Sequence, residues 1–144
     1  MSNEYIIKNI IDLANPLLGS KIILFSDEFF APAKRIINPS PPVFKENVFD
    51  GHGKWMDGWE TRRRRSKGND YVIIKLGKPG KIKLVDVDTT FFNGNQPEYA
   101  QVEGCFSKNN NLNNIKWIKI TKKNKIKPNN KNILKSKSSK TFNF

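Results

Sequence analysis

Residues 71–88 read YVIIKLGKPGKIKLVDVD, and this stretch decides the fold class. Two runs rich in β-branched residues flank the segment from Gly77 to Gly80, whose proline and glycines favour a chain reversal. Short strands separated by turns, with little helix, predict an antiparallel β-sandwich. Two further candidate strands follow, at residues 99–105 and 115–120.

Towards the N-terminus the pattern changes. Apolar residues at a helical spacing predict a short amphipathic helix over residues 5–13. Residues 22–25 then read as a first strand. Residues 26–70 show no strong periodicity but carry many aromatic side chains, so we expect an ordered, packed loop with a functional role.

The last residues of the run IKLVDVD change the phase of its alternation, which places Asp86 and Asp88 where the strand ends. Strand ends and the loops that follow them commonly carry functional sites. Together with Asn93, these carboxylates offer the hard oxygen ligands that a divalent cation prefers. The plainer alternative is that Asp88 caps a turn through Thr89 and Thr90.

Residues 53–65 read GKWMDGWETRRRR, which packs two Trp, two carboxylates and four Arg into thirteen residues. The segment has no apolar period, so it reads as a loop or strand edge whose side chains make contacts. Arginine grips a carboxylate or phosphate with two parallel hydrogen bonds. Asp57 and Glu60 add groups that can transfer protons. These residue types indicate a small polar site for an anionic ligand.

The net charge of +13 is unevenly distributed. Residues 1–103 hold 15 Lys/Arg and 13 Asp/Glu, whereas residues 104–144 hold 11 Lys and no acidic residue. We therefore expect one folded domain over residues 1–121 and a largely disordered Lys/Asn/Ser-rich tail over residues 122–144. Because the basic excess lies outside the motifs, nucleic acid is expected to bind at most non-specifically, through the tail.

Several classes of protein are not indicated. The single cysteine, Cys105, excludes an internal disulfide, and its strand-like surroundings favour a buried structural thiol over a nucleophile. No run of eighteen apolar residues suggests a membrane span, and the N-terminus does not resemble a signal peptide. The last residues are not a Ser-Lys-Leu peroxisomal signal. We expect a cytoplasmic protein.

Three blocks, taken in order, resemble the allantoicase (allantoate amidinohydrolase) family. They are SDEFFAPA at residues 26–33, the segment 53–65, and VDVDTTFFNGN at residues 85–95, with Gly104-Cys105 resembling a further block. The resemblance covers roughly residues 5–120. It implies a hydrolase of purine catabolism that acts on a non-peptide C–N bond and converts allantoate to ureidoglycolate and urea.

The resemblance also implies a fold and an assembly. Allantoicases look like two tandem repeats, each a jelly-roll β-sandwich of the galactose-binding-domain type. The present chain would be a first repeat whose closing strands are not recognisable, and so an incomplete one. It would form a homo-oligomer and take allantoate as its small-molecule partner.

The resemblance and the chemistry of allantoate suggest roles for the motif residues. Arg62 and Arg63 would anchor the substrate carboxylate, Asn93 would contact a ureido arm, and Trp59 would stack on the substrate. General acid–base work would fall to Asp57, Glu60 and Glu28.

Each of these roles has a structural alternative. The arginines could form a solvated face, the carboxylates could pair with them or brace loops, and the tryptophans could pack under the loop. No cofactor is certain, although a divalent cation such as Mn²⁺ at Asp86 and Asp88 stays open. The alternative function is a catalytically inactive, truncated relative that only binds a small ligand.

Overall fold

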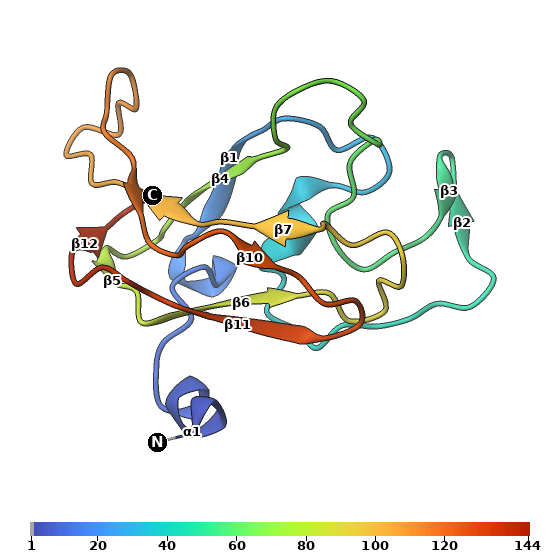
Figure 1. Ribbon diagram of the computed structural model, residues 1–144, viewed down its shortest axis with the longest axis horizontal. Coiled ribbons are helices and arrows are strands. Elements are labelled where there is room, and N and C mark those ends of the chain that lie inside the picture. The colour runs from blue at the N-terminus through green and yellow to red at the C-terminus, as the bar shows by residue number, and fades with distance from the viewer. Residues whose placement is uncertain (1) are drawn as a thin grey trace. The chain divides into compact units, whose positions relative to one another are not determined.

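The computed structural model describes residues 2–144 and divides the chain into two compact units. The inserted unit comprises residues 14–77, and the discontinuous unit comprises residues 2–13 and 78–144. Within the described residues the named strands pair two by two, always antiparallel (Figure 1). The predicted all-β class is therefore confirmed.

The inserted unit is built on the antiparallel pair β1–β4. Phe25 lies opposite Val72, and the register shifts between Ile22 and Leu24. This pair confirms the strands predicted at residues 22–25 and 71–76. The elements of the unit are η1 (Pro16–Leu18), β1 (Lys21–Phe25), η2 (Ala33–Ile37), β2 (Phe49–Asp50), β3 (Gly53–Lys54) and β4 (Val72–Lys75).

The turn after η1 touches the backbone at the end of β4. The Gly77 amide donates to Ser20 Oγ at 2.8 Å. A Cβ atom on Gly77 would lie 1.9 Å from the Leu18 carbonyl oxygen. Only glycine allows so close an approach, because any other residue would drive a carbon into this carbonyl.

The discontinuous unit is built on the pair β6–β11, in which Leu84 lies opposite Lys135 and Asp88 opposite Lys131. Shorter pairs join β5 to β12, β7 to β10 and β8 to β9. Its elements are α1 (Asn3–Lys8), β5 (Gly80–Lys81), β6 (Leu84–Asp88), β7 (Tyr99–Ala100), β8 (Glu103–Gly104), β9 (Ile118–Lys119), β10 (Asn124–Lys125), β11 (Lys131–Lys135) and β12 (Thr141–Phe142).

Two sequence-based expectations need correction. The strands before and after Gly77–Gly80 do not pair with each other: β4 pairs with β1, and β6 with β11. Turn residues reverse the chain, but they do not decide which strand it meets afterwards. The predicted helix over residues 5–13 also ends earlier, at Lys8, because so short a helix propagates only where packing supports it. No helix within residues 2–144 is long and apolar enough to cross a membrane.

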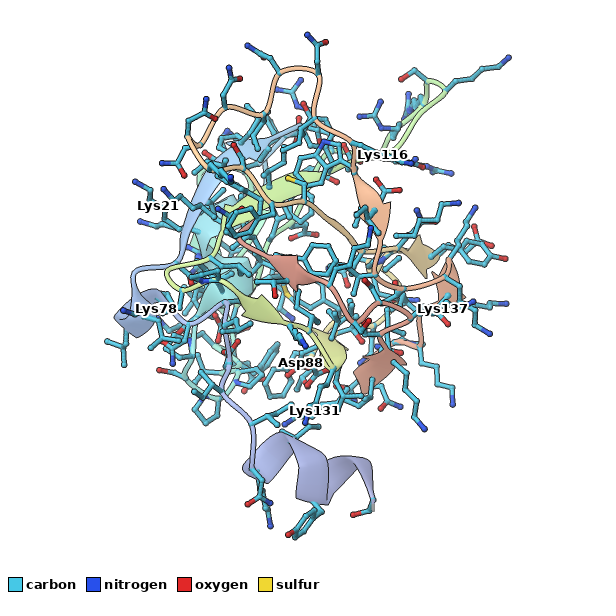
Figure 2. The ribbon with its side chains drawn as sticks, turned by 90° about the vertical axis from the view of Figure 1, so that its left-hand side faces the viewer. Lys21, Lys78, Asp88, Lys116, Lys131 and Lys137 are labelled. Atoms are coloured by element: carbon cyan, nitrogen blue, oxygen red, sulfur yellow. The ribbon has the colours of Figure 1, made fainter. Side chains whose placement is uncertain are left out.

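The prediction of a largely disordered segment over residues 122–144 is wrong. The segment contributes β10, β11 and β12 to the discontinuous unit. Its eight lysines are exposed, Lys131 and Lys137 among them (Figure 2). Its apolar side chains are few, but four of them are buried: Ile126, Leu134, Phe142 and Phe144. In β11 the buried Asn132 and Leu134 alternate with exposed or half-buried residues, so one face of the strand is buried although most of its residues are polar.

Phe142 lies at the centre of this core, with 1% of its surface exposed. Its ring packs against Gly104, where a Cβ atom would lie 2.7 Å from Phe142 Cδ1. The neighbouring Cys105 donates its amide hydrogen to the Phe144 carbonyl at 3.1 Å. Cys105 is buried, as predicted, and desolvation raises the pKa of its thiol. At neutral pH the thiol therefore stays protonated, which suits a buried structural cysteine better than a nucleophile.

Candidate active site

The arginine-rich segment is fastened to the segment that follows β1. The Trp59 indole N–H donates to the Asp27 carbonyl at 2.7 Å. Backbone hydrogen bonds join Ala31 and Glu60 in both directions, at 3.1 and 3.2 Å. Two of the predicted motif blocks, around residues 26–33 and 53–65, therefore meet in the inserted unit.

Asp27 is the first of two carboxylates that organise this site. One carboxylate oxygen accepts the amide hydrogens of Phe29 at 2.9 Å and Arg62 at 3.0 Å. The other lies 3.8 Å from Arg62 Nε. The amide of Phe29, then that of Arg62, and the Arg62 and Arg64 charges hold the pKa of Asp27 below its ordinary value. Asp27 is thus ionised at neutral pH and fixes Arg62 through both main chain and side chain.

Asp70 is the second organising carboxylate. One of its oxygens accepts from Ser26 Oγ at 2.9 Å and from Arg64 Nη2 at 3.0 Å. The other accepts from Thr61 Oγ1 at 3.3 Å. Gly68, with φ +111°, provides the left-handed turn through which the chain returns to Arg64. Asp70 therefore ties both ends of the arginine segment to the strand end.

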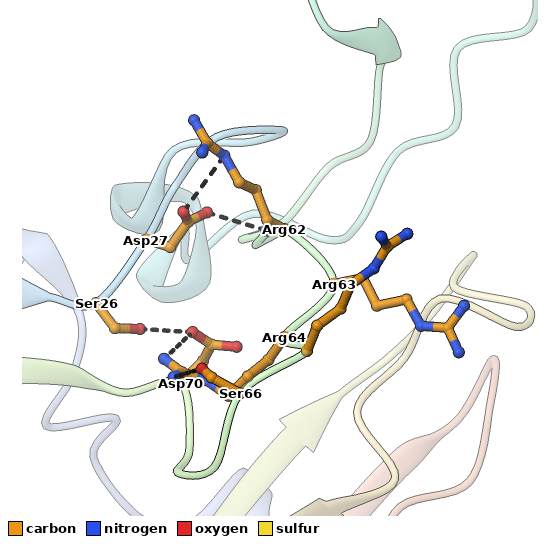
Figure 3. Close-up of a pocket in the computed structure, with 8 residues that line it drawn as sticks. Ser26, Asp27, Arg62, Arg63, Arg64, Ser66 and Asp70 are labelled. Carbon is orange, nitrogen blue, oxygen red and sulfur yellow. Dashed lines mark hydrogen bonds and ion pairs between the residues drawn. The ribbon is translucent and has the colours of Figure 1, made fainter.

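These groups enclose a shallow hollow of about 230 Å³ (Figure 3). Four arginines and two aspartates line it, so its lining carries two more guanidinium groups than carboxylates. This excess favours an anionic ligand. The lining residues are Ser26, Asp27, Arg62, Arg63, Arg64, Arg65, Ser66 and Asp70.

The predicted acid–base residues lie near this hollow in sequence, but none of them lines it. Glu28 Oε2 accepts the Ala33 amide hydrogen at 2.9 Å, and Asp57 Oδ2 accepts the Val43 amide hydrogen at 2.8 Å. Both carboxylates therefore brace loops, the structural alternative that the sequence left open. Glu60 is half-buried and is held by its main-chain pairing with Ala31.

The aromatic residues of the segment are packed and partly capped by cations. Trp59 is half-buried, with its indole nitrogen committed to Asp27. The Trp55 ring lies 4.3 Å from Lys45 Nζ and 5.1 Å from Arg35 Cζ. Such contacts hold cations over the ring face. Packing of Trp59 under the loop is thus observed, and a substrate contact stays a prediction.

The remaining predicted site residues, Asn93, Asp86 and Asp88, belong to the discontinuous unit. Asn93 is exposed in a turn. Asp88 accepts from the Thr90 amide at 2.9 Å and from the Thr90 hydroxyl, so it caps the turn after β6. No group of three or more His, Cys, Asp or Glu residues within residues 2–144 could hold a metal ion. The suggested ligands Asp86 and Asp88 are only two such residues, so a divalent cation there stays a prediction.

Asp86 has a shifted protonation equilibrium. Partial desolvation, followed by the neighbouring Asp88 charge, raises the pKa of Asp86 to about 6, and Lys131 opposes the rise. The side chain is exposed, so water screens much of this effect. Ionised Asp86 is therefore slightly unfavourable in the folded state.

Asp86→Asn is expected to stabilise the protein at pH 7, by less than about 1 kcal/mol after screening. An aspartate binds its proton more tightly in this folded state than in the unfolded chain. Its contribution to stability is therefore present at low pH and falls as pH rises from about 4 to about 6. Urea unfolding of both proteins between pH 4 and pH 7 measures the difference. A difference independent of pH would contradict the raised pKa.

Sequence reasoning missed Asp70 and Ser26 as parts of the site. Asp70 lies five residues after the arginine run, beside a candidate strand. The available signal was local: an acidic residue that follows Gly68 can fold back onto the preceding arginines. Ser26 belongs to a recognised block, but nothing in its type distinguished it from a loop serine.

Comparison with known proteins identifies the family. The family model described as "Allantoicase repeat" matches residues 11–144. Curated relatives include a probable allantoicase of Acinetobacter baumannii strain SDF, 48% identical over 85% of this chain, and one of Acinetobacter baylyi, 54% identical over 74%. The matches cover only 36% and 32% of those relatives, so the chain spans about a third of their length.

Solved structures agree with this result. The crystal structure of allantoicase from Saccharomyces cerevisiae has a TM-score of 0.79 and 30% identity, over 92% of this chain and 42% of that one. A second structure, described as allantoicase, has a TM-score of 0.78. The predicted all-β sandwich class is thereby confirmed, as is the resemblance carried by the motif blocks. The chain belongs to the allantoicase family.

Proposed function

We propose that this chain carries an allantoicase site, which hydrolyses allantoate to ureidoglycolate and urea. The observation that carries the proposal is the arginine-lined hollow, because it is built from two blocks by which the chain resembles its family. Its excess of positive charge matches the single carboxylate of allantoate. Of the two arginines predicted to anchor this carboxylate, Arg63 is proposed to contact it directly, and Arg62, which pairs with Asp27, to support the lining. Trp59 is the proposed aromatic contact of the substrate.

The reaction breaks the bond between the central carbon of allantoate and one ureido nitrogen. The oxygen of water ends on that carbon, and the departing nitrogen takes a proton to leave as urea. A positioned carboxylic acid or carboxylate can make both proton transfers faster. Asp57, Glu60 and Glu28 are the proposed groups.

Among these three, we favour Glu60 for proton transfer. Glu28 and Asp57 each accept a loop amide hydrogen, so their replacement disturbs loops as well as chemistry. Glu60 directly precedes the segment Thr61–Arg65, whose arginines line the hollow, and its main chain pairs with Ala31. Its side chain can therefore change without releasing that pairing.

A urea-release assay with allantoate, with and without Mn²⁺, tests the proposal. We expect urea from the wild-type chain, and a loss of about 100-fold or more in kcat for Glu60→Gln. Glu28→Gln and Asp57→Asn serve as matched controls, in which the melting temperature should fall as well. If the folded wild-type chain releases no urea at any metal concentration, the proposed activity is contradicted.

One observation favours a second candidate, a ligand-binding module without catalysis. Both carboxylates that line the hollow are paired with arginines, so the hollow alone is built for binding. Calorimetry would then show allantoate binding without urea release. In that case Glu60→Gln would leave the affinity unchanged.

We further propose that the protein is a cytoplasmic homo-oligomer. Large apolar side chains of β1, among them Ile23, Leu24 and Phe25, are exposed and could be covered by another subunit. The single buried thiol suits a reducing compartment. The exposed lysines of residues 122–144 support weak, salt-sensitive binding to nucleic acid and no specific recognition. Light scattering, cell fractionation and a salt titration test these three points.

A further inference from the structure

We propose that Arg63 and Arg65 bind the anionic ligand directly, and we call this pair the anion grip. Arg62 and Arg64 instead hold the shape of the hollow through contacts within the protein, and we call them the frame. The proposal rests on the proposed function for the identity of the ligand, a small carboxylate. It assigns different work to four adjacent arginines that look equivalent in the sequence.

Arg62 and Arg64 are already committed to contacts within the protein. Arg62 lies 3.8 Å from Asp27 and has its guanidinium carbon 4.1 Å from the centre of the Phe29 ring. Arg64 donates to Asp70 at 3.0 Å and to Ser66 at 3.4 Å. Figure 3 shows both side chains directed at their aspartates. An incoming carboxylate would have to compete with these contacts.

Arg63 and Arg65 are free of such commitments. Both are exposed, and neither makes an ion pair with any acidic residue among those the structure describes. Figure 3 shows Arg63 directed away from Asp27 and Asp70. The two positive charges in excess over the lining carboxylates therefore reside on these two side chains.

The backbone explains this division. Residues 61–65 contain no helix or turn, and in an extended chain successive side chains point to opposite sides. Arg62 and Arg64 are directed at the aspartates, and Arg63 is directed away from them (Figure 3). From the same alternation we infer that Arg65 lies on the side of Arg63. Residues two apart in an extended chain are separated by about 7 Å, so both forks can reach one small anion between them.

Asp27 and Asp70 act as positioning residues for this grip. Asp27 holds the Arg62 amide, and Asp70 holds Arg64, Thr61 and Ser26 together. The segment between these contacts, which includes Arg63, therefore has a set direction before a ligand arrives. Such preorganisation reduces the ordering cost of binding.

The geometry also defines the ligand class. A hollow of about 230 Å³ is smaller than the 300–1,000 Å³ of typical drug-sized sites, so it suits a small molecule. Planar guanidinium groups pair best with the two coplanar oxygens of a carboxylate. The grip thus predicts strong discrimination between a carboxylate and its neutral carboxamide.

A double-mutant-type cycle, in which both the protein and the ligand are changed, tests the anion grip. Calorimetry compares allantoate and its neutral carboxamide analogue, each with wild-type protein and with the Arg63→Gln/Arg65→Gln double variant. We expect the double variant to bind allantoate about 10- to 100-fold more weakly than wild type and the carboxamide equally well. The loss should shrink in 0.5 M salt, because the side chains are exposed.

The matched control is Arg62→Gln/Arg64→Gln, which removes the same number of charges from the frame. It should retain discrimination between carboxylate and carboxamide while lowering the melting temperature. Arg63→Lys/Arg65→Lys should recover part of the lost affinity. Asp27→Asn should weaken allantoate binding without abolishing discrimination, as expected of a positioning residue.

Each failure has a separate signature. If allantoate binds to the wild-type protein and the Arg63→Gln/Arg65→Gln variant retains full discrimination, the grip is wrong and the proposed function stands. If the affinities show that the Arg63 and Arg65 side chains interact with the ligand carboxylate but no urea is released, the anion grip is supported and the proposed activity is contradicted. If the folded wild-type chain binds neither ligand, the grip is overturned together with its proposed substrate.

Discussion

Phe142→Ala is expected to lower the free energy of unfolding by about 3–5 kcal/mol. The ring is 1% exposed, packs against Gly104 and belongs to β12, which pairs with β5. Its removal leaves a cavity that the pairing of β12 with β5 prevents from collapsing fully. Chemical denaturation followed by tryptophan fluorescence measures the change. Because a small domain has about 5–15 kcal/mol of stability, the variant should be close to unfolding.

The matched control for Phe142→Ala is Phe106→Ala, since Phe106 has the same side chain but is 49% exposed. The control should change stability by no more than about 0.5 kcal/mol. Equal, small effects of the two substitutions would show that residues 122–144 are not part of the folded core. That result would restore the expectation of a disordered tail.

Gly77→Ala is expected to destabilise the protein by about 3 kcal/mol or more. The new methyl group would lie 1.9 Å from the Leu18 carbonyl oxygen and 2.4 Å from its carbonyl carbon. These are main-chain atoms, which no side-chain rotation can move away. Relief requires separating η1 from the end of β4, and this separation also breaks the bond from the Gly77 amide to Ser20.

Gly51→Ala is the matched control for this change. Nothing lies within 4 Å of a Cβ atom at Gly51, which sits in the turn between β2 and β3. It should therefore be neutral or slightly stabilising. Thermal unfolding of the two variants distinguishes local contact from a general effect of glycine replacement. Equal melting temperatures would contradict the close approach at Gly77.

Strand positions in the centre of the chain could be predicted, but strand partners could not. The runs around Val72–Lys75 and Leu84–Asp88 are rich in β-branched residues, which is a local property of the sequence. Phe25 and Val72, which face each other, are 47 residues apart in the sequence, and Leu84 and Lys135 are 51 residues apart. No motif links either pair. The turn between β4 and β6 suggested that these two strands pair, but each pairs with a strand that is distant in the sequence.

The segment 122–144 was predicted wrongly because composition averages over positions. Its lysine content suggests disorder, yet Leu134 and Phe142 occupy positions where one apolar side chain closes the core. A reading of alternation in Lys131–Lys135 would have detected the strand. Low mean hydropathy thus conceals a strand with one buried face.

The candidate site could be predicted as a set of blocks but not as a set of roles. Residue type shows that Arg62–Arg65 can bind an anion, and the resemblance shows which blocks belong together. Neither residue type nor resemblance can show that Asp27 pairs with Arg62 and Asp70 with Arg64, because these pairings depend on where the chain folds back. Asp70 in particular acquires its role only through the turn at Gly68.

In the sequence, the inserted unit interrupts the discontinuous unit, and this order has a consequence for synthesis of the protein. Residues 14–77 emerge from the ribosome as one uninterrupted stretch, and β1 can pair with β4 as soon as the latter is free. Strand β6, by contrast, must wait for β11, and β5 for β12. During this interval the apolar residues of β6 have no strand to pack with. Partly folded chains that expose such residues are prone to aggregate. The exposed lysines of the late strands then add charge to the surface and so oppose aggregation.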